Sequence, residues 1–184
     1  MTLDTLDAQL RSARARVLAV LDGLSDESAN RKPAPDVWSV AEVVDHLNRL
    51  AADYLPVLEQ AYASAPAGRA DGDVPLGLVG SLFVRVVGPT GRPTKTFGTM
   101  QPPASGPAVS ALDVAAERAT FEADMARFLA LADRARRTAQ IRAGLPILPI
   151  VRLRGVALLA AMAAHVHRHA DQIERRAALV QPAR

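Results

Sequence analysis

Four stretches of this 184-residue chain carry apolar side chains at repeated steps of three and four residues. This spacing places the apolar side chains on one face of an α-helix, which has about 3.6 residues per turn. It predicts long helices over residues 3–24, from residue 39 past residue 54, over about 110–139 and over about 153–179. Each helix must bury its apolar face, and packing the four faces together is the simplest solution. The pattern therefore predicts an all-α fold, a four-helix bundle.

The second of these helices has a clearly marked start. Ser39 and Glu42 have the spacing of a capping box, in which each side chain accepts a hydrogen bond from the other residue's backbone N–H. Trp38 and Val43 occupy the positions of a hydrophobic staple. His46 then falls on the same face as Val43, three residues further on. A histidine is therefore expected on the apolar face of this helix.

The connections between the helices are rich in turn-forming residues. Residues 25–35 and 144–149 are predicted to be irregular. The segment 65–109 alternates prolines with glycines, and connections of this length are usually functional or disordered. Its apolar residues between 78 and 86 predict a short helix ending near Gly88. Residues 89–107 are expected to cross one end of the bundle as a lid, with Lys95, Thr96 and Phe97 as candidate substrate contacts.

Size and composition limit the kind of protein this can be. A chain of 184 residues has the size of one domain, so residues 1–184 are expected to form a single domain. The chain has no cysteine, which excludes disulfides, thiolate metal ligands and a cysteine nucleophile. Any thiol chemistry must therefore use a thiol that arrives with the substrate.

Charge and hydropathy give little sign of a nucleic-acid or membrane partner. The formal net charge is only +3, and the arginines between 134 and 142 lack interleaved aromatic residues. No apolar run approaches the roughly 20 residues that a membrane helix needs. The N-terminus does not have the pattern of an export signal. We therefore expect a cytoplasmic protein that binds neither nucleic acid nor a membrane.

The most informative polar residues are the histidines of the last helix. His165 and His169 are four residues apart, so they project side by side from one face, next to Met162 and Ile173. His167 points nearly the opposite way and is expected in solvent. One interpretation is that the two inward histidines are core residues with hydrogen-bond partners. The other is that they bind a metal ion, because apolar neighbours offer buried imidazoles no polar partner.

If the second and fourth helices are neighbours, His46 can join this pair. Three imidazoles without a cysteine describe an open site, in which a position is left for water or substrate. Imidazole suits Zn, Ni, Cu and Fe alike, so the ligands do not identify the metal. Each ligand should donate its other ring N–H to an acceptor. The candidates for that role are Asp53, Gln172 and Glu42, although Glu42 is also needed for capping.

The motif from Trp38 to Leu47, together with His165, His169, Gln172 and Ile173, resembles the DinB-like superfamily of bacterial metal-binding proteins. The resemblance implies a four-helix bundle in which His46, His165 and His169 bind a divalent metal, usually Zn or Ni. It also implies that dimers are frequent. Known activities in that superfamily include S-transfer with the thiols bacillithiol or mycothiol, and a mycothiol-dependent maleylpyruvate isomerase.

Three classes of function remain open on the sequence alone. The first is a metal-dependent enzyme of the thiol S-transferase type, acting as a homodimer on a small-molecule substrate, with a low-molecular-weight thiol as a candidate partner. A metal-dependent hydrolase is the alternative within this class. The second is a non-catalytic module that binds a metal or a small ligand. The third is a structural bundle whose histidines are satisfied core groups.

Overall fold

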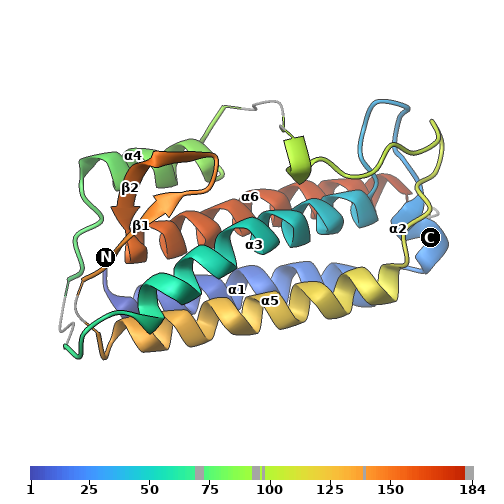
Figure 1. Cartoon of the computed structure of the whole chain (residues 1–184). Helices are drawn as coiled ribbons and strands as arrows, with labels where there is room; N and C mark the ends of the chain where they lie inside the picture. Colours follow the sequence, from blue (N-terminus) through green and yellow to red (C-terminus); the bar gives the residue numbers. More distant parts are fainter. Residues whose placement is uncertain (69–72, 93–95, 97, 139, 181–184) are drawn as a thin grey trace.

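The computed structural model describes residues 1–68, 73–92, 96, 98–138 and 140–180 (Figure 1). Most of these residues are helical, as the periodicity predicted. The long helices are α1 (Leu3–Asp22), α3 (Val40–Ala63), α5 (Val114–Ala135) and α6 (Gly155–Val180). Shorter elements are α2 (Asp26–Asn30), α4 (Leu78–Val87), the 3-10 helix η1 (Gly98–Met100), β1 (Arg142–Leu145) and β2 (Leu148–Arg154).

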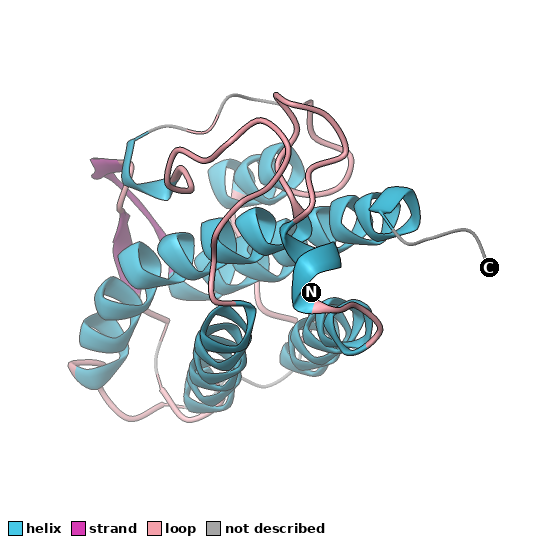
Figure 2. Cartoon of the chain, turned by 90° about the vertical axis from the view of Figure 1, so that its right-hand side faces the viewer, coloured by secondary structure: helices cyan, strands magenta, loops and turns pink. Residues whose placement is uncertain are grey.

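The long helices lie side by side (Figures 1 and 2). Helix α1 contacts α5 and α6, and α3 contacts the same two helices. The side chains at their common centre are almost completely buried, including Leu6 and Leu10 of α1, Leu55 of α3, Phe121 of α5 and Ile173 of α6. The contact between α3 and α6 matters most for function, because these helices carry the inward histidines.

A two-stranded hairpin, which the sequence did not predict, accompanies the helices of this mostly helical fold. Strands β1 and β2 pair antiparallel, with a register irregularity between Gly144 and Leu145, and lie at one margin of the helices (Figure 2). The segment 144–149, predicted to be irregular, supplies the ends of both strands and their turn. Burial of Ala143, Leu145 and Leu153 holds the hairpin to the core. Helix α6 therefore begins at Gly155 and not near residue 153.

Two further boundaries differ from the sequence prediction. Residues 25–35 were predicted to be irregular, but they contain α2, whose N-cap Ser25 accepts a hydrogen bond from Ser28 N. Helix α5 ends at Ala135, four residues before the predicted end, and its C-cap is Arg136. Short helices and helix ends depend on caps and local packing, which the apolar period does not report.

The predicted capping box is present at the start of α3. Ser39 Oγ accepts from Glu42 N at 3.1 Å, and Glu42 Oε2 accepts from Ser39 N at 2.7 Å. Ser39 Oγ also lies 2.8 Å from Ser110 Oγ, which joins this start to the segment before α5. Both hydrogen-bonded groups are buried, so the box fixes where α3 begins and therefore which side of the helix His46 occupies.

Between α3 and α5, the described residues include two short helices that pack against α6 and α3. The short helix expected there is α4, which contacts α6 along its length, and η1 contacts α3. Gly88 allows the end of α4 to approach α6 closely, because a Cβ there would lie 3.3 Å from Ala164 Cβ. Of the candidate lid contacts, Thr96 is described, while Lys95 and Phe97 lie outside the described residues.

Among the helices that the structure describes, none combines the length and the apolar character needed to cross a membrane.

Removing the α3 cap should destabilise the protein measurably. We expect Ser39→Ala to lower the free energy of unfolding in urea by about 1–2 kcal/mol, because a buried cap and its bond to Ser110 are both lost. Ser25→Ala, which removes the cap of the short surface helix α2, is the control and should cost about 0.5 kcal/mol. Equal losses of unfolding free energy in the two variants would contradict a special role of the Ser39–Glu42 capping box in stability.

Candidate metal centre

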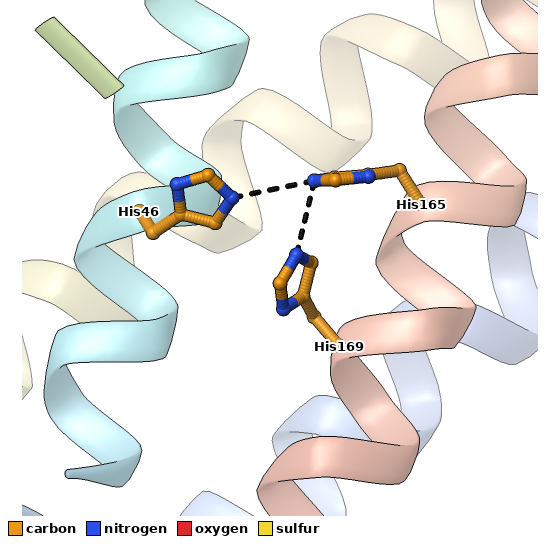
Figure 3. Close-up of side chains that lie close together, drawn as sticks. All are labelled: His46, His165 and His169. Carbon is orange, nitrogen blue, oxygen red and sulfur yellow. Dashed lines mark hydrogen bonds between the residues drawn. The ribbon is translucent and has the colours of Figure 1, made fainter. Parts of the chain in front are cut away.

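Three imidazoles from two helices converge at one point. His46 comes from α3, and His165 and His169 come from successive turns of α6 (Figure 3). The Nε2 atom of His165 lies 3.3 Å from that of His46 and 3.0 Å from that of His169. A ligand atom from each ring lies within 4.8 Å of the others, as expected for the ligands of one metal ion. The structure thus brings together the three histidines that the sequence singled out.

The opposite nitrogen of each ring, Nδ1, faces an oxygen acceptor. These pairs are His46 with Met100 O at 2.7 Å, His165 with Val87 O at 3.2 Å and His169 with Gln172 Oε1 at 2.7 Å. A carbonyl oxygen can only accept, so Nδ1 of each ring carries the hydrogen. In a neutral ring the hydrogen on Nδ1 leaves a lone pair on Nε2. All three lone pairs therefore point toward the common centre.

Burial keeps these rings neutral at ordinary pH. It is the main cause that lowers the pKa of His46, and it lowers the pKa of His169 well below its usual value. Burial, and to a lesser extent the proximity of the His46 ring, lowers the pKa of His165 to about 3. Neutral imidazole is the form that binds metal, so protons compete weakly for these nitrogens.

The donor set fits a divalent metal ion. Two nitrogens that each lie about 2.0–2.1 Å from a tetrahedral zinc are roughly 3.3 Å apart, close to the two Nε2 separations in this cluster. With the hydrogens on Nδ1, the Nε2 atoms are acceptors facing acceptors, which is unfavourable without a cation or a proton between them. A metal ion would convert this repulsion into three bonds. His46, His165 and His169 would hold it, each through Nε2.

The acceptor for His165 comes from the end of α4. The last carbonyl groups of a helix have no partner within the helix, and Val87 is the last residue of α4. Arg168, one turn of α6 before Gln172, donates to the carbonyls of Val86 and Gly88 at 3.3 and 3.5 Å. The positive guanidinium therefore anchors the negative end of α4 beside the histidines.

The histidines form part of the wall of a cavity of about 840 Å³. Apolar side chains supply much of the remaining wall, among them Leu50, Phe83, Met100 and Met162. The ring of Trp38 lies 5.3 Å from the ring of His46, centre to centre, and also lines the cavity. His46 and His169 are almost fully buried, whereas His165 is partly exposed. A small molecule in the cavity would therefore reach the three-histidine centre.

Of the three acceptors expected around the ligands, Gln172 contacts a histidine. The carboxylate of Asp53 accepts instead from Thr99 Oγ1 at 3.2 Å. Besides its bond to Ser39 N, Glu42 accepts from Ser105 Oγ at 2.6 Å and lies 3.4 Å from Lys32 Nζ. Neither carboxylate has a hydrogen bond to the three rings among the described residues.

Sequence reasoning missed the two backbone acceptors, Met100 O and Val87 O. A carbonyl has no residue signature, so no motif could identify Met100. The carbonyl of Val87 could have been suspected, because the predicted end of a short helix near Gly88 implies free carbonyls there.

Comparison with protein-family models gives a match over residues 9–173 to the model described as the DinB superfamily. The chain belongs to the DinB superfamily. The match includes all three clustered histidines and most of the four long helices. The superfamily and the three-histidine cluster together are compatible with metal binding.

One curated relative matches a shorter part of this DinB-superfamily chain. It is "Uncharacterized protein YuaE" of Bacillus subtilis (strain 168), which is 39% identical over 54 residues. The match covers 29% of this chain and 33% of that protein, and the relative's name states no activity. No solved structure matches the chain.

Metal content should depend on the clustered histidines and not on histidine in general. After dialysis, we expect the purified protein to bind about one zinc or nickel ion per chain. His169→Ala, dialysed in the same way, should bind at least about tenfold less metal, because one of the three ligands is lost. His167→Ala is the matched control, since His167 lies on the same helix and contacts Gln9 O and Arg16. Elemental analysis measures both. Equal metal content in the two variants would contradict the site.

Proposed function

We propose that this protein is a metal-dependent enzyme of the thiol S-transferase type, built on the four-helix bundle of its superfamily. His46, His165 and His169 would bind Zn or Ni, and a small-molecule thiol would enter the adjoining cavity. The observation that carries the proposal is the orientation of the three rings: every Nδ1 is held by an acceptor, and every Nε2 faces one point on the cavity wall.

A divalent ion in such an open site would lower the pKa of a thiol or water and polarise a carbonyl group. The chain's own residues supply orientation and shielding. Gln172 and the carbonyls of Val87 and Met100 fix the ring orientations. Trp38 and the apolar cavity wall limit the access of bulk water to His46. Because the chain has no cysteine, the sulfur nucleophile would come from the substrate.

The homodimer and the cytoplasmic location expected from the sequence are part of the same proposal. Sedimentation velocity of the metal-loaded protein tests the first of them, with a dimer as the expected species.

The reaction type can be tested with paired assays. We expect zinc- or nickel-loaded protein to accelerate the reaction of a low-molecular-weight thiol with an electrophile. His46→Ala should reduce this rate by at least about 100-fold, because the metal loses one of its three ligands. His167→Ala should retain the wild-type rate. Each variant is compared at equal protein concentration with the metal added in slight excess.

An ester-hydrolysis assay on the same samples separates the alternative. Hydrolysis without thiol consumption, abolished by His46→Ala, would replace the transferase proposal by a hydrolase. Metal binding with neither activity would favour a non-catalytic binding module. Thiol consumption that survives His46→Ala would contradict any reaction at this centre.

A further inference from the structure

A second feature of the cavity is an arginine that lacks a partner. Arg176 lies near the end of α6, lines the same cavity as the histidines and is half-buried. Its Nη1 atom is inaccessible to solvent and makes no hydrogen bond. No hydrogen bond or ion pair joins the Arg176 guanidinium to any other described residue. A partly buried cation without a hydrogen-bonded anion is unfavourable.

Two other arginines that contact or lie on α6 have partners within the fold. Arg16 donates to Asp171 and Glu174, and Arg168 donates to carbonyls at the end of α4. The carboxylate close enough to influence Arg176 is that of Glu42, which is already bonded to Ser39, Ser105 and Lys32. Burial lowers the pKa of Arg176 to about 10, so the guanidinium still carries its charge at neutral pH.

The position of Arg176 on α6 places it in line with the metal ligands. His165, His169, Gln172 and Arg176 follow one another at steps of four, three and four residues, so they occupy one face of the helix. Arg176 is seven positions after His169, which corresponds to a rise of roughly 10 Å along the helix axis. Helical side chains lean toward the N-terminus, so the guanidinium extends back toward the histidines. A small molecule of several carbon atoms can therefore span both.

The rest of the cavity has a different character. Toward the hairpin and α4 its wall includes Phe83, Ile147 and Met162, whereas Asp36, Arg175 and Arg176 line another part. Asp36 and Arg175 are exposed and therefore hydrated. Each would bind a charged group of a ligand more weakly than a half-buried side chain does. The cavity is thus suited to an amphiphilic ligand with one anionic group.

We propose that Arg176 binds a carboxylate of the substrate while the reacting group of the same molecule lies at the three-histidine centre. This inference rests on the proposed function, and it specifies the substrate class as a carboxylate-bearing small molecule. The planar guanidinium fork matches a carboxylate through two parallel hydrogen bonds, which also fixes the orientation of the substrate. Arg176 is therefore a specificity-determining residue. The reacting group is at the opposite end of the substrate from the carboxylate that Arg176 binds.

The test uses full-length protein loaded with Co²⁺, whose thiolate charge-transfer absorption reports a bound thiol without requiring turnover. Mercaptohexanoate and mercaptohexanol are titrated in parallel, because they differ in the terminal group and share the thiol. We expect the carboxylate compound to bind wild-type protein at least about tenfold more tightly, as a charged hydrogen-bonded pair implies. In Arg176→Gln the two thiols should bind within about twofold of each other, because the remaining apolar contacts are the same for both.

Arg175→Gln is the matched control. It removes the same charge from the adjacent position, but from an exposed side chain, so the preference for the carboxylate should persist. Equal binding of the two thiols by the wild type, or a preference that survives Arg176→Gln, would overturn the inference. In either case, the thiolate absorption of the cobalt protein would still support binding of a thiol at the metal centre, as the proposed function requires.

A second measurement covers the case in which neither thiol produces the absorption, which would count against the proposed function. Octanoate should then raise the melting temperature of the metal-loaded wild type and of Arg175→Gln, but not that of Arg176→Gln, whereas octanol should not distinguish the three proteins. No difference between wild type and Arg176→Gln would overturn the inference. Without ligand, Arg176→Gln should melt no lower than the wild type, and a loss of several degrees would instead assign Arg176 a structural role.

Discussion

The candidate metal centre depends on the hydrogen bonds that hold Nδ1 of three inward-facing imidazoles. A neutral imidazole has one donor and one acceptor nitrogen, and fixing the donor fixes the direction of the acceptor. Here the acceptors are the carbonyls of Met100 and Val87 and the amide of Gln172. They come from three different elements, so the inward direction of the lone pairs is a property of the whole fold. Metal affinity follows from this preorganisation as much as from the identity of the ligands.

This dependence gives a role to the long segment between α3 and α5. Two of the three acceptors belong to it, one at the end of α4 and one in η1. The segment is held in place by Arg168, which donates to the end of α4, and by contacts of η1 with α3. This proline- and glycine-rich segment therefore orients two of the candidate ligands and forms part of the cavity wall.

The long helices and the three histidines could be predicted because both leave a direct trace in the sequence. Apolar residues repeat with the helical period, and the capping box at Ser39 and Glu42 marks a helix start by side-chain chemistry. The hairpin could not be predicted in this way, because strands as short as β1 have too few residues for the alternation to stand out beside Pro146 and Pro149. Backbone acceptors such as Met100 O carry no residue signature at all. The absence of a hydrogen-bonded partner for Arg176 is a property of the packed structure and leaves no pattern in the sequence.

The most direct test of the metal centre is the tautomeric state of its histidines, measured by long-range ¹H–¹⁵N NMR on metal-free protein before and after zinc is added. We predict that His46, His165 and His169 are neutral with the hydrogen on Nδ1, and that zinc shifts the Nε2 resonance of all three while leaving His167 unchanged. A hydrogen on Nε2 in any of the three rings of the zinc-loaded protein, or an Nε2 resonance that does not respond to zinc, would contradict it.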